Sequence, residues 1–217
     1  GGSCCLQRCV HVCCVGRKRI VSRAFRLDSW HHGLALLLLL VGVQQLAGAA
    51  LIQAKAWLAP RLIERSWQQT LVRGGKPTKP WPWADTWPVA RLLAPRQGVR
   101  RMVLAGDSGH ALAFGPGHAM ASAMPGSKGL AVIGGHRDTH FAFLRSLRQG
   151  DLLQLELPNG ELRSYRVEQV RIVDSRRESV PAQRGEERLL LVTCYPFDAL
   201  SPGGPLRFTV SAKPVGQ

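Results

Sequence analysis

The stretch LLLVTCYPFD, residues 189–198, ends a run of strand-forming apolar residues with a single thiol. Leu, Val and Thr suit a strand, and the Pro and Asp that follow favour a turn. Cys194 is therefore expected at the end of a strand, at a rim of the fold. It is the only cysteine after Cys14, so an internal disulfide in this part of the chain is excluded. A lone cysteine with a histidine elsewhere is a candidate nucleophile, and a buried core cysteine is the alternative.

Short apolar runs like this one recur from about residue 99 onward, and Pro and Gly separate nearly all of them. Asn-Gly within LPNGE, residues 157–161, predicts a hairpin because this pair suits a tight primed turn. Only FAFLRSL, residues 141–147, is typical of a short helix. The pattern predicts an antiparallel sandwich or a closed barrel. The runs are RMVLAG, ALAFG, LAVIGG, DLLQLELP, ELRSYRVEQVRIVD, RLLLVTC and LRFTVSA.

Four histidines in this region are candidate partners for the thiol. His136 follows the strand-like LAVIGG, so it also lies at a strand end. His118 lies in the glycine-rich GPGHA, and His110 begins a strand. His140 follows four residues after His136. A metal site on a His136/His140 pair is disfavoured, because GGHRDT is a poor helix start and no third ligand is evident. Each histidine could equally be an ordinary hydrogen-bonded residue.

Arg207 enters the last predicted strand and is the candidate for holding negative charge. Alternation along LRFTVSA places Leu206, Phe208 and Val210 on one face and Arg207 on the other. A developing oxyanion needs such a donor, although a single outward arginine is by default only solvated.

Residues 33–52, GLALLLLLVGVQQLAGAALI, contain no formal charge. About 20 apolar residues suffice to span a bilayer as a helix. A cleaved signal peptide is the alternative, yet this run exceeds the roughly 7–15 residues of a signal core. Positive charge before the span favours a cytoplasmic N-terminus, since only Asp28 opposes the six residues Arg8, Arg17, Lys18, Arg19, Arg23 and Arg26.

Five cysteines crowd into the first fourteen residues, with His11 among them. Metal binding, acylation and an unstructured extension are all conceivable, and the composition favours the extension because it offers no core. The net charge of +15 is spread over the whole chain, which fits contact with anionic lipid. Nucleic-acid binding is disfavoured because the basic residues come without a recognisable reading element. The five are Cys4, Cys5, Cys9, Cys13 and Cys14.

The expected organisation has four parts. Residues 1–32 form a basic, Cys-rich cytoplasmic segment and residues 33–52 a transmembrane helix. Residues 53–98 form a helical stalk and a Pro- and Trp-rich connector, and residues 99–217 an all-β domain. The tryptophans of the connector either lie at the bilayer interface or pack on the domain that follows.

Five motifs together resemble the sortase family. They are GPGH at 115–118, PGSKG at 125–129, VIGGHRDTHF at 132–141, LVTCYPFD at 191–198 and RFTV at 207–210. They occur in the family's order, and the resemblance covers roughly residues 85–213. The PWPWADTW lead-in and the single anchor look most like the class found in Gram-negative bacteria.

The resemblance implies a closed eight-stranded β-barrel with one or two short helices behind the transmembrane helix. It implies a cysteine transpeptidase in which Cys194 is the nucleophile, His136 the general acid/base and Arg207 the oxyanion holder. Thr193, His118 and Tyr195 would contact substrate, with no metal or cofactor.

The resemblance further implies a substrate protein with an LPxTG-like sorting signal, an amine acceptor and membrane lipid around the anchor. The barrel would lie in the periplasm, tethered to the inner membrane. Two alternatives remain: a membrane-anchored cysteine hydrolase without transfer, and a non-catalytic envelope-binding β-domain.

Overall fold

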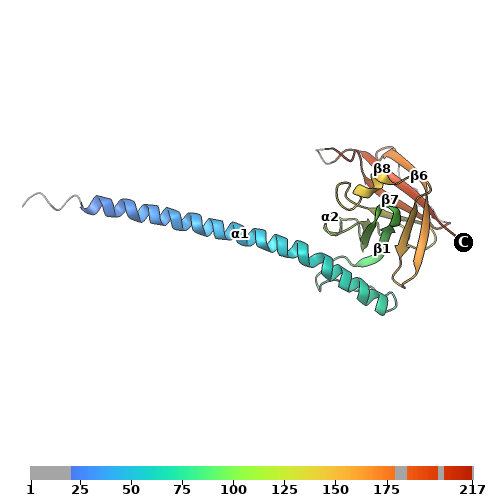
Figure 1. Cartoon of the computed structure of the whole chain (residues 1–217), viewed down its shortest axis with the longest axis horizontal. Helices are drawn as coiled ribbons and strands as arrows, with labels where there is room; N and C mark the ends of the chain where they lie inside the picture. The colour runs from blue at the N-terminus through green and yellow to red at the C-terminus, as the bar shows by residue number, and fades with distance from the viewer. Residues whose placement is uncertain (1–20, 179–184, 200–202, 217) are drawn as a thin grey trace, which may run out of the picture. The chain divides into compact units, whose positions relative to one another are not determined.

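The computed structural model describes residues 21–178, 185–199 and 203–216. Contacts divide the chain into two compact units, residues 1–55 and 56–217. In the second unit, the described strands form a closed barrel (Figure 1). They are β1 (Pro88–Ala94), β2 (Val99–Ala105), β3 (Gly117–His118), β4 (Leu130–Gly134), β5 (Leu152–Glu156), β6 (Leu162–Asp174), β7 (Arg188–Cys194) and β8 (Leu206–Pro214). Short helical segments are η1 (Pro95–Gln97), α2 (Gly109–Leu112) and η2 (Ala142–Ser146).

The order of the strands around the barrel is β1-β2-β3-β4-β7-β8-β6-β5, and pairing of β1 with β5 closes it. β4 and β7 are parallel, whereas β7 and β8 are antiparallel. The C-terminal ends of β4 and β7 therefore lie at the same edge as the N-terminal end of β8. The predicted closed eight-stranded barrel, preceded by a long apolar helix, is confirmed.

The inside of the barrel is filled by alternate residues of its strands. Along β7, Leu189, Leu191 and Thr193 are buried and the residues between them are half-buried. Burying a leucine side chain contributes about 1.5–3 kcal/mol, so these positions fix the register of β7. They also leave Cys194 on the outer face of the barrel.

The predicted hairpin is present between β5 and β6. Leu157 donates its amide to the Glu161 carbonyl at 2.8 Å, and Gly160 donates to the Leu157 carbonyl at 2.8 Å. Gly160 has a φ of 83°, which a residue with a side chain rarely adopts.

Three elements differ from the expectations. β1 lies inside the range 53–98 expected to be stalk and connector, and all its residues except Leu93 are buried. A strand buried on both faces lacks the alternation that reveals a strand. The ALAFG run and His110, expected to form a strand, lie at a helical turn, α2, instead. His118, expected in a loop, is the last residue of β3.

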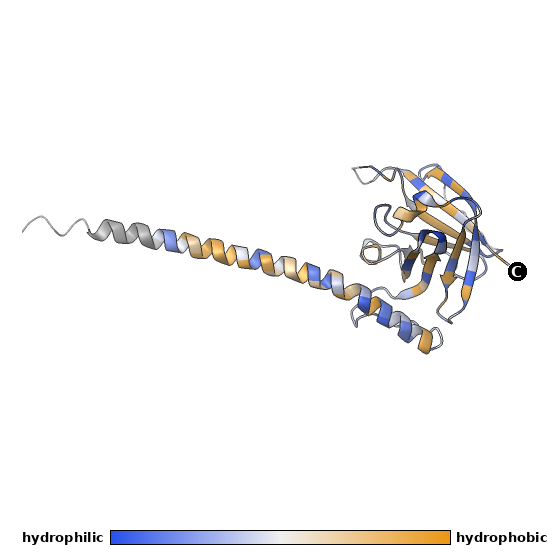
Figure 2. Ribbon diagram, in the orientation of Figure 1, coloured by the Kyte–Doolittle hydropathy of each residue, from blue (hydrophilic) through white to orange (hydrophobic). Residues whose placement is uncertain are grey.

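The helix α1 runs from Val21 to Val72. Its part up to residue 55 is the described structure of the first unit. From Trp30 onward it is long and apolar enough to cross a membrane, a test that N-terminal signal sequences also meet. Figure 2 shows the hydrophobic residues that run along it, and Leu36 to Leu40 are all exposed. The expected span, residues 33–52, lies within this helix. The Cys-rich segment, including Cys4 to Cys14, lies outside the described residues.

In the second unit, the last turns of α1 pack against the barrel. Trp67 has no exposed surface, and its Nε1 donates to Glu156 Oε2 of β5 at 3.4 Å. Arg91 of β1 pairs with Glu156 at 2.8 Å and also with Glu64 of α1. Part of the expected stalk is therefore a packed element of the barrel unit. The buried residues on this side of α1 are Ala59, Ile63, Ser66, Trp67 and Thr70.

Candidate active site

Cys194 and Arg207 are direct cross-strand partners at one edge of the barrel. The register of β7 and β8 pairs them after Thr193 with Phe208 and Val192 with Thr209. Residues paired in this way point to the same face of a sheet, with Cβ atoms about 4.5–5.5 Å apart. The thiol and the base of the guanidinium side chain therefore share the outer face, and both residues are half-buried.

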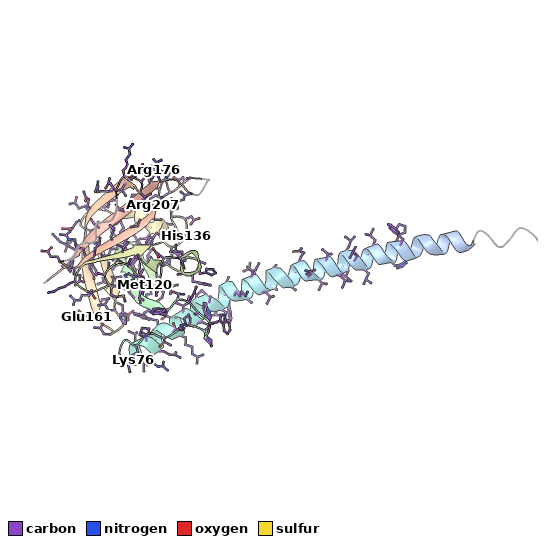
Figure 3. All side chains as sticks on the ribbon, turned by 180° about the vertical axis from the view of Figure 1, so that it is seen from behind. Lys76, Met120, His136, Glu161, Arg176 and Arg207 are labelled. Carbon is purple, nitrogen blue, oxygen red and sulfur yellow. The ribbon has the colours of Figure 1, made fainter. Side chains whose placement is uncertain are left out.

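His136 is brought to the same edge by the neighbouring strand β4. Gly134 pairs with Val192, and the amide of Gly135 donates to the Val192 carbonyl at 3.1 Å. Continuing this register places His136 beside Cys194. The imidazole is exposed, and Figure 3 shows His136 and Arg207 away from Glu161, which lies in the hairpin at the other end of β6.

The turn that carries His136 is held by Phe141. The Phe141 amide donates to the His136 carbonyl at 2.9 Å, and the Phe141 ring lies in the core. A Cβ on Gly135 would lie 2.8 Å from that ring, closer than real Cβ contacts allow. The glycine before His136 is therefore required for the chain to pass over the ring.

The Arg207 guanidinium is ordered by the end of the β7–β8 connection. Its Nη1 donates to the Gly204 carbonyl at 2.6 Å and to the Leu206 carbonyl at 3.0 Å. The expected alternation of β8 is confirmed, since Val210 and Ala212 are buried and Arg207 belongs to the opposite face. A guanidinium has five N–H donors, so it can hold this connection and still donate to a further oxygen.

Thr193 and His118 differ from the expected substrate contact, because both side chains are buried. Thr193 points into the barrel, and its hydroxyl donates to the Gly135 carbonyl at 2.7 Å. It thereby ties the strand of the thiol to the turn of His136. His118 has no exposed surface, and its Nε2 lies 2.8 Å from the Ala123 carbonyl. In this structure both side chains bond to backbone carbonyls, those of Gly135 and Ala123.

Tyr195 lies directly after the thiol, within an aromatic cluster. Its ring stacks on Phe208, with centroids 6.3 Å apart, and meets Phe197 edge-on at 6.2 Å. The ring is half-buried, so an exposed part remains beside the thiol. This cluster fixes the start of the β7–β8 connection.

Two further contacts near the site had no signal in the expected motifs. Arg137 donates through Nη2 to the Ala199 carbonyl at 2.7 Å, so the His136 turn is tied to the β7–β8 connection. Arg145 of η2 lies over the Phe197 ring at 5.8 Å. The adjacency of Arg137 to His136 in GGHRDT was the one available clue.

Cys194 on β7, Arg207 on β8 and His136, two residues beyond β4, thus lie at one edge of a closed barrel. Thiol-dependent acyl transfer needs these groups: a nucleophile, a proton carrier and a donor for the oxyanion. The structure is therefore a closed β-barrel with a cysteine, a histidine and an arginine at one edge.

Comparison with known proteins gives the family. The model of the sortase domain matches residues 92–215, and the chain belongs to the sortase family, whose members are cysteine transpeptidases. It is 34% identical over 125 residues to Sortase D of Bacillus subtilis (strain 168), covering 57% of this chain and 62% of that protein. The chain therefore spans less than two thirds of the length of this curated relative.

Solved structures share the fold. Sortase A from Corynebacterium diphtheriae superimposes with a TM-score of 0.55 at 25% identity, covering 62% of this chain and 64% of that one. A Clostridium perfringens Sortase D5 transpeptidase gives a TM-score of 0.56 at 20% identity, covering 71% of this chain and 94% of that one.

Proposed function

We propose that this chain is a membrane-anchored cysteine transpeptidase. It cleaves an LPxTG-like sorting motif through a thioacyl-enzyme intermediate and transfers the acyl group to an amine acceptor. The pairing of Cys194 with Arg207 beside the His136 turn carries the proposal. Membership of the sortase family supports the same chemistry.

The first half of the reaction forms the thioester. The Cys194 thiolate attacks the scissile carbonyl, the carbon becomes tetrahedral and negative charge collects on its oxygen. Arg207 donates to that oxygen from the adjacent strand. His136 as imidazolium then gives its proton to the departing amine, and the C–N bond breaks. Preorganised donors of this kind are often the largest contribution to catalysis.

The second half reverses these roles. The acceptor amine attacks the thioester carbonyl and His136 takes the proton that the amine loses. The C–S bond breaks, an amide forms and the thiolate is regenerated. Water in place of the amine gives hydrolysis, so a shortage of acceptor turns the transferase into a slow protease.

The cellular setting is part of the proposal. The apolar run 33–52 anchors the chain in the inner membrane, residues 1–32 stay in the cytoplasm and the barrel lies in the periplasm. The basic residues before the span support this orientation, and the PWPWADTW lead-in supports the Gram-negative class. A membrane-impermeant maleimide should label Cys194 in spheroplasts of the expressing cell. Labelling that needs membrane rupture would contradict the orientation.

The enzymatic proposal is tested with the full chain in detergent and a fluorogenic LPxTG-type peptide. We expect cleavage by the unaltered chain, a loss of about 1,000-fold or more in Cys194→Ala, and a ligated product in mass spectra when an amine is added. Cleavage without ligation at saturating amine would indicate a hydrolase. Undiminished cleavage in Cys194→Ala would overturn the assignment of Cys194 as the nucleophile.

A further inference from the structure

A pocket of about 450 Å³ is lined by residues of α1 and β2 and by Thr139 and His140, which follow His136 in the chain. Its size is within the range of small-molecule sites. Three parts of the barrel unit form it: the packed end of α1, the first half of β2 together with Phe114 beyond α2, and the turn that follows His136. The lining residues are Pro60, Ile63, Glu64, Arg100, Arg101, Met102, Phe114, Thr139 and His140.

The polar part of the pocket is electropositive. Arg100, Arg101 and His140 face a single carboxylate, that of Glu64, which is already ion-paired with Arg91. A group with negative charge would therefore lie among basic residues, and the Arg101 guanidinium is close enough to His140 to lower the pKa of its imidazole. Arginine is well suited to phosphate and carboxylate because its planar fork matches their oxygens.

The pKa of His140 is lowered in this environment. Burial, then Arg101, then His136 lower the pKa of His140 below its ordinary value of 6.5. Asp138 and a hydrogen bond to the Leu112 backbone act in the opposite direction and do not restore it. Burial first, and neighbouring positive charge second, thus favour the neutral imidazole, and an anion in the pocket would oppose the part that the positive charge contributes.

The remaining wall of the pocket is apolar. Ile63 is buried against Leu104, and Met102 packs on the same cluster. Phe114 remains 39% exposed, and its ring meets Trp81 edge-on with centroids 5.5 Å apart. A bound molecule would therefore place a charged end among the arginines and a carbon chain along Phe114 and Met102.

The pocket and the proposed proton carrier share one turn. His136 and His140 stand at its two ends, the Phe141 amide bonds back to the His136 carbonyl at 2.9 Å, and the two imidazoles interact electrostatically. A molecule held at Arg100, Arg101 and His140 is therefore beside the group that takes a proton from the acceptor amine.

We propose that this pocket binds the anionic group, a phosphate or a carboxylate, of the amine acceptor. The inference rests on the proposed transpeptidation. The anion anchors the acceptor while its amine reaches the thioester next to His136. The amine nitrogen then forms the amide bond, the C–S bond breaks and the proton passes to His136.

The first test compares matched acceptors with the full chain in detergent. O-Phosphoethanolamine is paired with ethanolamine, and glycine with glycinamide, at equal concentrations of unprotonated amine. Mass spectrometry measures transfer and hydrolysis of one sorting peptide. We expect a KM about tenfold lower for at least one anionic acceptor than for its neutral partner, and the two pairs separate phosphate from carboxylate.

Variants assign the preference to the pocket. Arg100→Gln and Arg101→Gln should each reduce the advantage of the anionic acceptor while leaving peptide hydrolysis unchanged. The matched control is Arg166→Gln, at an exposed arginine of β6 that pairs in register with Leu152 and Lys213. It is seven residues along β6 from Val173, which pairs with Arg207. It should keep the preference.

A second measurement does not depend on activity. In full-length Cys194→Ala, inorganic phosphate or acetate should raise the pKa of His140, followed by NMR and assigned with His140→Gln. Arg100→Gln should weaken the response to the anion, and Arg166→Gln should not.

The possible outcomes separate the two proposals. Peptide cleavage with no preference for anionic acceptors, and no response of His140 to either anion, overturns this inference alone. A preference that survives both arginine variants overturns the pocket as its origin. Absence of cleavage overturns the proposed function together with the acceptor, even where His140 responds to phosphate.

Discussion

Cys194 on β7 and Arg207 on β8 are paired in register at the edge of the barrel. The sheet itself, and no flexible loop, sets the spacing between their Cα atoms. The chemistry of the guanidinium can therefore be changed without moving the strand that carries it.

Arg207→Lys should lower kcat for peptide cleavage about 100-fold with a smaller effect on KM. Lysine keeps the charge but loses the planar fork that donates to the Gly204 carbonyl and to a second oxygen. Steady-state kinetics on a fluorogenic peptide provide the measurement. Arg171→Lys, the same change on exposed β6, is the control, and an equal loss in both variants would argue against a specific role.

Trp67→Ala should reduce the free energy of unfolding of the barrel unit by about 3–5 kcal/mol. The side chain is fully buried and its Nε1 donates to Glu156, so truncation leaves a cavity between α1 and β5. Thermal unfolding followed by circular dichroism measures the effect. Trp83 is 83% exposed, and Trp83→Ala should leave stability nearly unchanged. Similar stability of the two variants would show that the end of α1 is not docked.

Tyr165→Phe should destabilise the barrel at neutral pH by about 1–3 kcal/mol. The buried hydroxyl donates to Glu187 Oε1 at 2.5 Å, and the variant leaves that buried carboxylate without this donor. Denaturant unfolding at pH 7 gives the difference.

The difference should shrink at high pH. Burial and then Glu187 raise the pKa of Tyr165 above its ordinary value of 10.0. A raised pKa gives stability that is present below pH 10 and is lost as the pH rises toward the folded-state pKa. Unfolding at pH 10.5 and above should therefore bring Tyr165→Phe closer to the unaltered chain. A constant difference from pH 7 to 11 would contradict the assignment.

Gly117→Ala should prevent β3 from pairing normally. A Cβ at this position would lie 2.2 Å from the Gly106 carbonyl oxygen, so the backbone must move. Gly109→Ala is the control, since a Cβ there meets nothing within 4 Å. We expect a lower melting temperature for Gly117→Ala and little change for Gly109→Ala, and equal melting temperatures would refute the close approach.

Several strands, and the positions of Cys194 and Arg207 in them, could be predicted from sequence. LRFTVSA shows the period of two that places Arg207 on the outer face, and the apolar run LLLVTC followed by Pro and Asp places Cys194 at a strand end. LPNGE identified the β5–β6 hairpin through Asn159-Gly160. The edge where the strands meet then followed from the motif order of a known family.

Other features lacked a local signal. β1 is buried on both faces. From sequence alone its Arg91 would be assigned to the surface, yet the side chain pairs with Glu64 and Glu156. The docked end of α1 did carry a pattern, with Ala59, Ile63 and Trp67 spaced four residues apart. The adjacent apolar span obscured this pattern. In a helix that is apolar on all sides, the sequence does not show where only one face begins to pack against the barrel.

The position of β8 between β6 and β7 has a consequence for biogenesis. Arg207 and the strand that joins β6 to β7 belong to the same late segment, Leu206–Pro214. Cys194 precedes this segment in the chain, so the thiol is synthesised before its cross-strand partner. Under the proposed function, the pairing of Cys194 with Arg207 is complete only once β8 has joined the sheet.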